Sequence, residues 1–300
     1  MNVIEINGIT KDYGNAKGVF DVSFKVKKGE VLGFLGPNGA GKTTTIRHLM
    51  GFIQPDSGNV RINGLDCFEK AHEIEKSCGY LPGEISFMDD MKGMEFINFI
   101  AGMKGMKSLE RAKELISFFE LNPSGRIKKM SKGMKQKIGI VCAFMQNPDI
   151  LILDEPTGGL DPLMQNKFIE LILQEKKKGR TILMSSHIFE EIERTCDRAV
   201  IIKEGKIVAV DSIEKLCGSK QKIFEIKFDS RDAAERFAKS FAGSSVEKNT
   251  VAVNVKGEVN GLIRSLGEYK VKDMNIRTQS LEELFMHFYG EDKTERNDEK

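Results

Sequence analysis

The residues best suited to chemistry lie in one glycine-rich segment, Gly36-Pro37-Asn38-Gly39-Ala40-Gly41-Lys42-Thr43-Thr44. It matches the pattern G-x-x-x-x-G-K-[ST], in which glycines leave backbone N–H groups open to a phosphate and the following helix presents its positive end to the same anion. Lys42 supplies a mobile positive charge for β- and γ-phosphates, and the Thr43 hydroxyl can ligate Mg²⁺. The segment therefore predicts a phosphate-binding loop, and the alternative is a glycine-rich turn that carries a lysine by chance.

Two acidic residues, Asp154 and Glu155, follow the apolar run 150–153. A buried strand would deliver both carboxylates to the carboxyl-terminal edge of a sheet, where open α/β sheets bind ligands. We expect Asp154 to hold Mg²⁺ through water and Glu155 to act as a general base on the attacking water. An isolated acidic pair is usually a solvated loop, but beside a phosphate-binding loop it predicts a Walker B motif.

The elements that must position these residues follow from hydrophobic periodicity. Segments 3–9 and 19–26 alternate with period two, whereas 31–35, 150–153 and 181–184 are apolar throughout. Continuous apolar runs are typical of strands buried on both faces. Helical patterns follow Gly36 and fill 162–178, up to Gly179. Strands that alternate with helices predict a parallel α/β sheet, with a Met- and Phe-rich helical insert at about 85–147.

Composition excludes several functional classes. The chain has 300 residues, with 46 Lys plus Arg against 44 Asp plus Glu, and a net charge of +2 gives no basic field for a nucleic-acid backbone. No nucleic-acid partner is expected. The five cysteines lack metal-ligand spacing and are typical of reduced, buried thiols. Apolar runs such as 138–145 fall short of the ~20 residues that span a bilayer, so any membrane role requires a partner.

The segment Met130-Ser131-Lys132-Gly133-Met134-Lys135-Gln136 precedes a helical pattern. A serine in this place is most often only a helix N-cap. Because it stands shortly before the acidic pair, it resembles the L-S-G-G-Q signature of the ABC ATPase family, in the S-K-G-M-K-Q form of bacterial drug exporters of the bacitracin-resistance type. Ser131 and Gly133 occupy the key positions, whereas Lys132 and Met134 depart from the commonest form.

Three further segments match motifs of that family in order: Lys11-Asp12-Tyr13-Gly14, Gly159-Leu160-Asp161 and Ser185-Ser186-His187. The resemblance implies that Tyr13 stacks on adenine, that Asp161 belongs to the D-loop, and that His187 is the switch histidine at the γ-phosphate. From its residue type alone, Tyr13 is equally an ordinary surface turn residue, and a lone histidine is more often structural.

One motif matches imperfectly. Gly79-Tyr80-Leu81-Pro82-Gly83-Glu84 resembles the Q-loop region, but Gly83 stands where a glutamine commonly contacts Mg²⁺ and the lytic water. Whether Gly83 or Glu84 serves in that role stays open, and the ordinary interpretation of the segment is a Pro-Gly turn. Its place in the chain predicts a groove that receives a membrane partner.

The resemblance covers residues 1–217 and implies an α/β P-loop NTPase cassette with a parallel core sheet, an antiparallel β subdomain and the helical subdomain at 85–147. After residue 217 the pattern predicts a small accessory α+β domain at 218–290, in the order β-α-β-α-β-α, which ends with a helix at about 280–288. The charged segment 291–300 is predicted to be a disordered tail.

The family resemblance implies an ATPase that uses ATP and Mg²⁺ and drives a separate transmembrane permease, as an exporter. Two copies, or two paired ATPase subunits, would sandwich ATP between Lys42, Asp154 and Glu155 of one chain and Ser131 and Gly133 of the other. The expected location is cytoplasmic, peripheral on the inner face of the cell membrane. The sequence leaves the transported substrate undetermined.

Two alternatives remain. A soluble ABC ATPase that acts on ribosomes or DNA usually has two cassettes or a long coiled-coil insertion, and neither is present in this sequence. A signalling GTPase would need an N-K-x-D motif, but Asn166-Lys167 is followed by Phe168 and Ile169.

Overall fold

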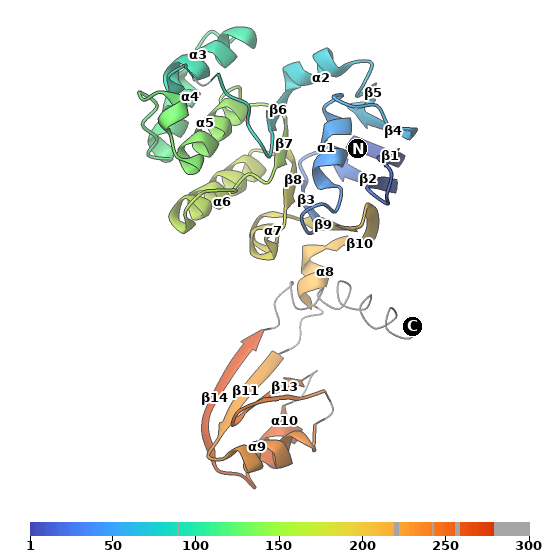
Figure 1. Ribbon diagram of the computed structural model, residues 1–300, viewed down its shortest axis with the longest axis vertical. Helices are drawn as coiled ribbons and strands as arrows, with labels where there is room; N and C mark the ends of the chain where they lie inside the picture. The colour runs from blue at the N-terminus through green and yellow to red at the C-terminus, as the bar shows by residue number, and fades with distance from the viewer. Residues whose placement is uncertain (89, 219–221, 242, 256–258, 279–300) are drawn as a thin grey trace. The chain divides into compact units, whose positions relative to one another are not determined.

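The computed structural model describes residues 1–88, 90–218, 222–241, 243–255 and 259–278 (Figure 1). Its internal contacts divide the chain into two compact units, Met1–Ile213 and Glu214–Lys300. The division falls at the start of α8 (Ile213–Gly218), four residues before the expected boundary at 217. The helix expected at 280–288 and the tail at 291–300 lie outside the described residues.

The first unit contains a six-stranded sheet that holds the predicted apolar runs. In spatial order its strands are β10 (Lys206–Ser212), β9 (Arg198–Lys203), β3 (Val31–Leu35), β8 (Thr181–Ser186), β7 (Ile150–Asp154) and β6 (Cys78–Leu81). All neighbours are parallel except β9 and β10. Every residue of β3, β7 and β8 is buried. The predicted parallel α/β core is therefore confirmed.

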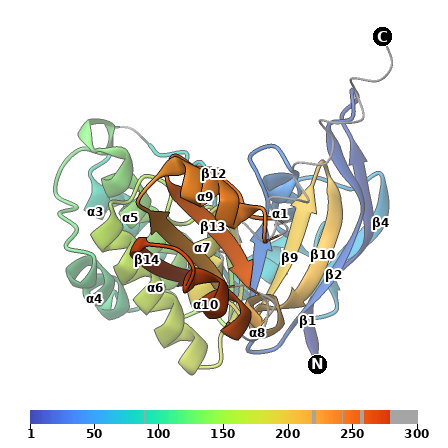
Figure 2. The ribbon, with the colours of Figure 1, turned by 90° about the horizontal axis from the view of Figure 1, so that it is seen from below.

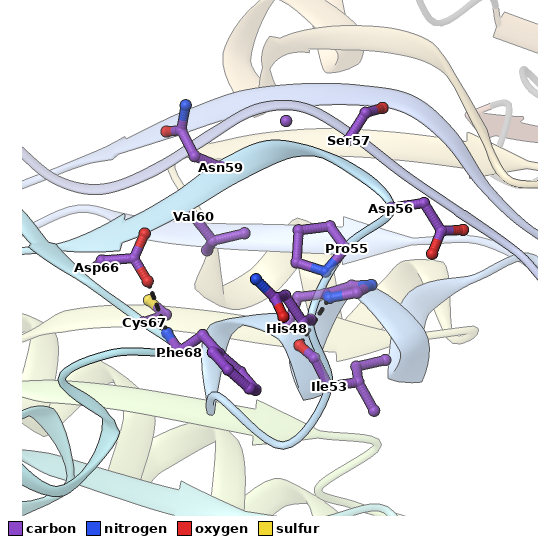
Figure 3. A pocket seen from close by; sticks show the side chains of 12 residues that line it. His48, Ile53, Pro55, Asp56, Ser57, Asn59, Val60, Asp66, Cys67 and Phe68 are labelled. Carbon is purple, nitrogen blue, oxygen red and sulfur yellow. Dashed lines mark hydrogen bonds between the residues drawn. The ribbon is translucent and has the colours of Figure 1, made fainter.

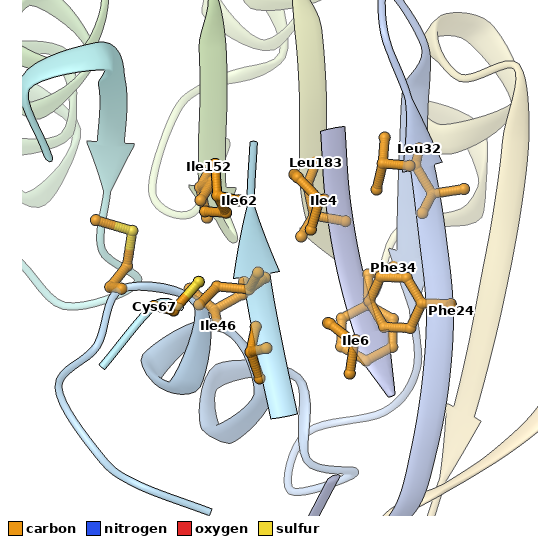
Figure 4. Close-up of a cluster of buried hydrophobic side chains, with 14 of the residues drawn as sticks. Ile4, Ile6, Phe24, Leu32, Phe34, Ile46, Ile62, Cys67, Ile152 and Leu183 are labelled. Carbon is orange, nitrogen blue, oxygen red and sulfur yellow. The ribbon is translucent and has the colours of Figure 1, made fainter. Parts of the chain in front are cut away.

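A second sheet of the same unit is antiparallel. Its strands are, in spatial order, β2 (Gly18–Lys27), β1 (Asn2–Asp12), β4 (Ser57–Ile62) and β5 (Leu65–Asp66). One cluster of buried side chains joins this sheet, α1 (Lys42–Leu49) and the six-stranded sheet, as Figure 4 shows for Ile4, Phe24, Ile46 and Leu183. A fully buried aliphatic or aromatic side chain stabilises the fold by about 1.5–3 kcal/mol, so this shared core holds α1 firmly between the sheets.

Helices fill the rest of the first unit. They are α2 (Ala71–Ser77), α3 (Gly93–Met103), α4 (Glu110–Phe118), the 3₁₀ helix η1 (Ile127–Lys129), α5 (Lys132–Phe144), α6 (Pro162–Lys177) and α7 (Phe189–Thr195). Figure 2 shows α3 to α6 on one side of this unit and β1, β2 and β4 on the other. The insert predicted at 85–147 thus contains α3, α4 and α5. Within the described part of the chain, no helix has the length and apolar character needed to cross a membrane.

After α8, the described residues of the second unit form a four-stranded antiparallel sheet with two helices. Along the chain it contains β11 (Lys222–Phe228), α9 (Arg231–Ala238), β12 (Ser245–Glu247), β13 (Thr250–Val255), α10 (Asn260–Leu266) and β14 (Val271–Thr278). The spatial order β12-β13-β11-β14 and the chain order β-α-β-β-α-β define a ferredoxin-like arrangement. Its core packs Phe224, Ile226 and Phe228 of β11 against Ala234 and Phe237 of α9.

The expected order β-α-β-α-β-α for this unit is wrong in one respect, because it lacks β12. This strand forms a hairpin with β13, and Lys248 in the turn adopts a left-handed conformation with φ 55°. β12 has only three residues, all of them exposed, which is too short for an alternation of apolar and polar residues to predict a strand.

The cysteines with described side chains are free thiols, as the composition predicts. Burial raises the pKa of Cys196 to about 12 and that of Cys67 to about 12. Such thiols stay protonated near neutral pH, which suits a structural role in the core.

Candidate active site

Parallel pairing brings the ends of three strands to one edge of the central sheet. Leu35, at the end of β3, pairs with Ser186 of β8, and Asp154, at the end of β7, pairs with Ser185 of the same strand. The glycine-rich loop that follows β3 therefore begins next to the acidic pair and to the segment that ends in His187. The backbone N–H of Gly36 donates to the carbonyl of Ser186 at 3.4 Å and fixes this junction.

Lys42 opens α1, and its ammonium group lies inside the loop. The side chain is only 5% exposed, and Nζ donates to the carbonyl oxygens of Gly36 at 2.6 Å and Pro37 at 3.1 Å. Nζ also lies 3.0 Å from Oε1 of Glu155. A buried ammonium group requires such compensation, because desolvation strongly disfavours an unpaired charge.

The loop can fold around this ammonium group because of its glycines. Gly41 has φ 107°, which side-chain-bearing residues rarely adopt, and a Cβ atom there would lie 2.7 Å from Cγ1 of Val19. A Cβ atom at Gly36 would lie 2.4 Å from the carbonyl oxygen of Ile202. Both positions thus exclude larger residues, which leaves the backbone N–H groups of the loop accessible to a phosphate.

Glu155 joins the other two predicted catalytic residues. Its Oε2 accepts a hydrogen bond from Nδ1–H of His187 at 2.5 Å, while Oε1 faces Lys42. Its backbone has φ 48°, a strained conformation for a residue with a long side chain and one that is found mainly at functional sites. The structure therefore brings Lys42, Glu155 and His187 into one group at the mouth of the loop.

Asp154 is fully buried one residue earlier. Its Oδ1 accepts a hydrogen bond from Oγ of Ser185 at 2.5 Å, whereas its Oδ2 has no hydrogen-bond partner among the described residues. Gly83 lies next to this oxygen: a Cβ atom at position 83 would be 3.2 Å from Oδ2. Glu84, by contrast, is exposed. A buried carboxylate oxygen without a donor is costly, so Oδ2 is suited to a cation or to a water molecule bound by one.

The oxygen atoms of Asp154 and Thr43 are suited to a Mg²⁺ ion that is bound together with nucleotide phosphates. In the described ranges, no group of three or more His, Cys, Asp or Glu side chains is placed to hold a metal ion. Mg²⁺ typically takes one or two protein ligands and completes its shell with phosphates and water. Asp154 and the exposed Thr43, in the first turn of α1, offer that small number of oxygen ligands.

Ser131 and Asp161, two of the other predicted nucleotide contacts, each cap a helix. Ser131 caps α5 by accepting from the N–H of Met134 at 3.2 Å, and Asp161 caps α6 by accepting from the N–H of Met164 at 3.0 Å. Gly133 lies against Gly159, since a Cβ atom at 133 would be 2.7 Å from that carbonyl oxygen.

The signature and the D-loop are thus adjacent, but among the described residues no hydrogen bond joins Ser131 or Asp161 to Lys42, Asp154 or Glu155. Tyr13 lies in the turn after β1 with its side chain 55% exposed, so its ring is accessible to a stacking ligand.

Sequence reasoning missed a buried network behind the site. Glu191 of α7, 4% exposed, accepts hydrogen bonds from the hydroxyl of Thr157 and from Oγ of Ser186 at 2.9 Å. It thereby links the segment after Glu155 to the segment before His187. Burial raises the pKa of Glu191. Ser185 lay within a recognised motif, but no spacing signal distinguished Glu191 from the surface acids of α7.

Comparisons with known proteins agree with this geometry. Residues 19–158 match the family profile described as ABC transporter. An uncharacterized ABC transporter ATP-binding protein of Methanocaldococcus jannaschii is 39% identical over 222 residues, which cover 71% of this chain and 79% of that relative. The chain belongs to the ABC transporter ATP-binding proteins.

Drug-resistance members of this ABC family are among the relatives. The bacitracin transport ATP-binding protein BcrA of Bacillus licheniformis is 36% identical over 235 residues, 77% of each chain. A solved ATP-binding subunit of an ABC transporter is 34% identical, with a TM-score of 0.66 over 71% of this chain and 91% of that structure. The resemblance inferred from the motifs is therefore confirmed, and the chain is an ABC ATPase whose relatives include this bacitracin transport protein.

A cavity of about 250 Å³ lies beside the end of α1 and β4 (Figure 3). Its wall includes His48, which is 1% exposed. Nδ1 of His48 bonds the carbonyl oxygen of Ile53 at 3.0 Å, and Nε2 has no partner among the described residues. Burial, the largest influence, lowers the pKa of His48. This histidine is therefore a core residue that is most stable in its neutral form.

The lowered pKa of His48 predicts a loss of stability in acid. The unfolded chain takes up a proton near pH 6.5, whereas the folded chain does so only at lower pH, so the free energy of unfolding falls as the pH drops below about 6.5. His48→Gln keeps a donor for Ile53 but has no titrating group, and it should remove this part of the acid dependence. Urea unfolding between pH 7.5 and 5.5 measures it. An equally steep decline in both proteins would contradict the assignment.

Proposed function

We propose that this chain binds ATP at residues 36–44 and hydrolyses it to power a separate transmembrane permease. The observation that carries the proposal is the group formed by Lys42, Glu155 and His187 at the mouth of the phosphate loop. It combines a cation for phosphate oxygens, a carboxylate for a water molecule and a histidine that orients the carboxylate. These are the parts that phosphoryl transfer to water requires.

The ion pair would rearrange when ATP binds. The γ-phosphate is a stronger partner for Lys42 than a carboxylate is, since it offers several charged oxygens, so the ammonium group would turn from Glu155 to the phosphate. Glu155 would then be free to accept a proton from the attacking water, while His187 holds its Oε2. Because Lys42 is fixed by two backbone carbonyls, its charge is preorganised for the transition state.

Thr43 and Asp154 would hold Mg²⁺ together with the nucleotide phosphates. When bound, Mg²⁺ neutralises charge that develops on the transferred phosphoryl group. Ser185 orients Asp154 through the 2.5 Å hydrogen bond to Oδ1 and leaves Oδ2 as the oxygen directed to the ion or its water. The Gly83 backbone would border this site in place of a Q-loop glutamine.

No described hydrogen bond joins Ser131 or Asp161 to Lys42, which is consistent with a site shared between two ATPase subunits. In this proposal the signature of one copy, with Ser131 and Gly133, faces ATP held by the phosphate loop of the other. The exposed ring of Tyr13 would stack on adenine. Residues 1–217 would form this ATP-binding domain, and 218–290 would be an accessory domain.

The permease partner is inferred from family and composition. BcrA is named for bacitracin transport, and this chain would likewise serve an exporter from the cytoplasmic face of the cell membrane. Large apolar side chains are exposed in the first unit, including Phe52 (60%), Met88 (49%) and Met103 (72%). Met88 follows the Q-loop region and Met103 ends α3, so both lie in segments suited to receive a membrane partner.

Lys42→Ala should leave the fold intact and abolish ATP hydrolysis, because no other described cation occupies the loop. The matched control is Arg47→Ala, which removes an exposed cation from the same helix and should keep the parent rate. Steady-state phosphate release measures both. A Lys42→Ala protein with activity within a few-fold of the parent would overturn the assigned role.

Glu155→Gln should bind ATP and hydrolyse it at least ~100-fold more slowly, because glutamine cannot accept the proton. With hydrolysis blocked, ATP should hold two copies together and ADP should not. Adding Ser131→Arg should prevent this dimer by placing bulk and charge in the shared site. Adding Ser240→Arg, an exposed position in the second unit, should not.

Light scattering with ATP or ADP, at protein concentrations well below tens of micromolar, measures this dimer. A Glu155→Gln protein that remains monomeric with ATP, or one that dimerises equally well when Ser131→Arg is added, would contradict the shared-site mechanism.

A further inference from the structure

The sheet of the second unit has two very different edges. β12 at one edge has three residues, whereas β14 at the other has eight and pairs with β11 along almost its whole length. Figure 1 shows β14 beside β11 at the end of the sheet. A very short edge strand resists pairing with other chains, but a long regular one presents a row of unpaired backbone donors and acceptors. β14 is therefore the edge on which another strand can add.

Apolar side chains of β14 are exposed on the face that carries the core. The register places Met274 opposite Ile226 and Ile276 opposite Phe224, and paired residues point to the same face of a sheet. Ile226 and Phe224 are buried, yet Met274 is 45% and Ile276 52% exposed. Within the part of the second unit that the structure describes, the core thus continues onto an exposed strip formed by Met274 and Ile276.

The residues of β14 are complementary to a second copy of themselves. We consider a two-fold axis perpendicular to the sheet at Asn275. It places Asp273 of each copy opposite Arg277 of the other, and Met274 of each copy opposite Ile276 of the other. Opposite charges and apolar pairs across strands both stabilise a sheet. Arg277 already has its Nε 2.7 Å from Oε1 of Glu225, so Glu225, Arg277 and the second copy's Asp273 would form a charge network.

Neighbouring two-fold registers lack this match. With the axis at Met274, Lys272 would face Ile276, and with the axis at Ile276, Met274 would face Thr278. A shift by an odd number of residues is excluded, because it would bring side chains from opposite faces together.

We propose that β14 is a homodimerisation edge, on which two copies of this chain pair through antiparallel β14 strands centred on Asn275. The result is an eight-stranded sheet in which the strip formed by Met274 and Ile276 is covered by its counterpart. This contact involves no residue of the ATP site, so it forms without nucleotide. It is expected at tens of micromolar protein, whereas the ATP-held dimer is measured at lower concentration, where the chain is monomeric with ADP, so the two contacts are tested separately.

The first test mixes two charge variants of the full chain in the absence of nucleotide. In a dimer of Asp273→Arg, both cross-strand pairs join two arginines. In a dimer of Arg277→Asp, both pairs join two aspartates. Each variant alone should dimerise roughly tenfold more weakly than the parent or worse, since opposed like charges destabilise pairing. Mixed together, they should form a heterodimer, because every pair again joins opposite charges.

Sedimentation velocity measures these equilibria, and Lys248→Asp, in the β12–β13 turn, is the control that should behave like the parent. A parent chain that stays monomeric at tens of micromolar, or variants that mixing does not rescue, would refute the proposed edge.

A disulfide gives a second test that does not depend on the charge variants folding alike. Asn275→Cys places the new thiols opposite each other at about 4.5–5.5 Å between Cα atoms, which a disulfide can bridge. Lys272→Cys places them roughly 20 Å apart along the strands, at ~3.4 Å per residue. Under mild oxidation only Asn275→Cys should form a covalent dimer, relative to the parent chain with its native cysteines.

Two outcomes of the cross-linking test contradict the proposal. Equal cross-linking of both cysteine variants would show random collision rather than a defined register. Cross-linking of Asn275→Cys only after residues 279–300 are removed would show that the chain covers β14 with its own carboxyl-terminal segment.

Discussion

The buried ammonium group of Lys42 is the charge around which the site is built. It is held by two backbone carbonyls of the glycine-rich loop and by the carboxylate of Glu155, which arrives from a different strand. This meeting is possible only because β3, β7 and β8 are adjacent and parallel, so that their carboxyl ends lie at one edge. The apolar character of these strands therefore fixes where the charges converge.

The acidic residues around the Lys42–Glu155 pair are also held by polar partners. Glu155 is shared between Lys42 and His187, Asp154 is oriented by Ser185, and Glu191 connects the segments that carry both acids and the histidine. Among the side chains of this network that the structure describes, the buried atoms without a hydrogen-bond partner are Oδ2 of Asp154, at the metal position, and Oε1 of Glu155, which forms the ion pair with Lys42. An unpaired atom in an otherwise satisfied network is the physical signature of a ligand position.

Much of this arrangement could be predicted because the signals are local in sequence. The loop pattern, the apolar runs and the acidic pair specify a phosphate-binding edge, and strand pairing then brings Lys42, Glu155 and His187 together. Long-range contacts could not be predicted in the same way. Glu191 has no spacing signal, the position of Gly83 beside Asp154 depends on tertiary packing, and β12, with three exposed residues, is too short to show a strand pattern. The Ser131 hydroxyl serves as an N-cap within one chain, and this bond neither requires nor excludes a role toward a second copy.

The most direct test of the central claim is a structure of the chain with Mg²⁺ and a non-hydrolysable ATP analogue. The account predicts that Nζ of Lys42 leaves Oε1 of Glu155 for the β- and γ-phosphate oxygens, while Nδ1 of His187 still holds Oε2. Glu155 would then face the space in line with the γ-phosphate. An intact Lys42–Glu155 pair with the phosphates bound elsewhere would contradict the account.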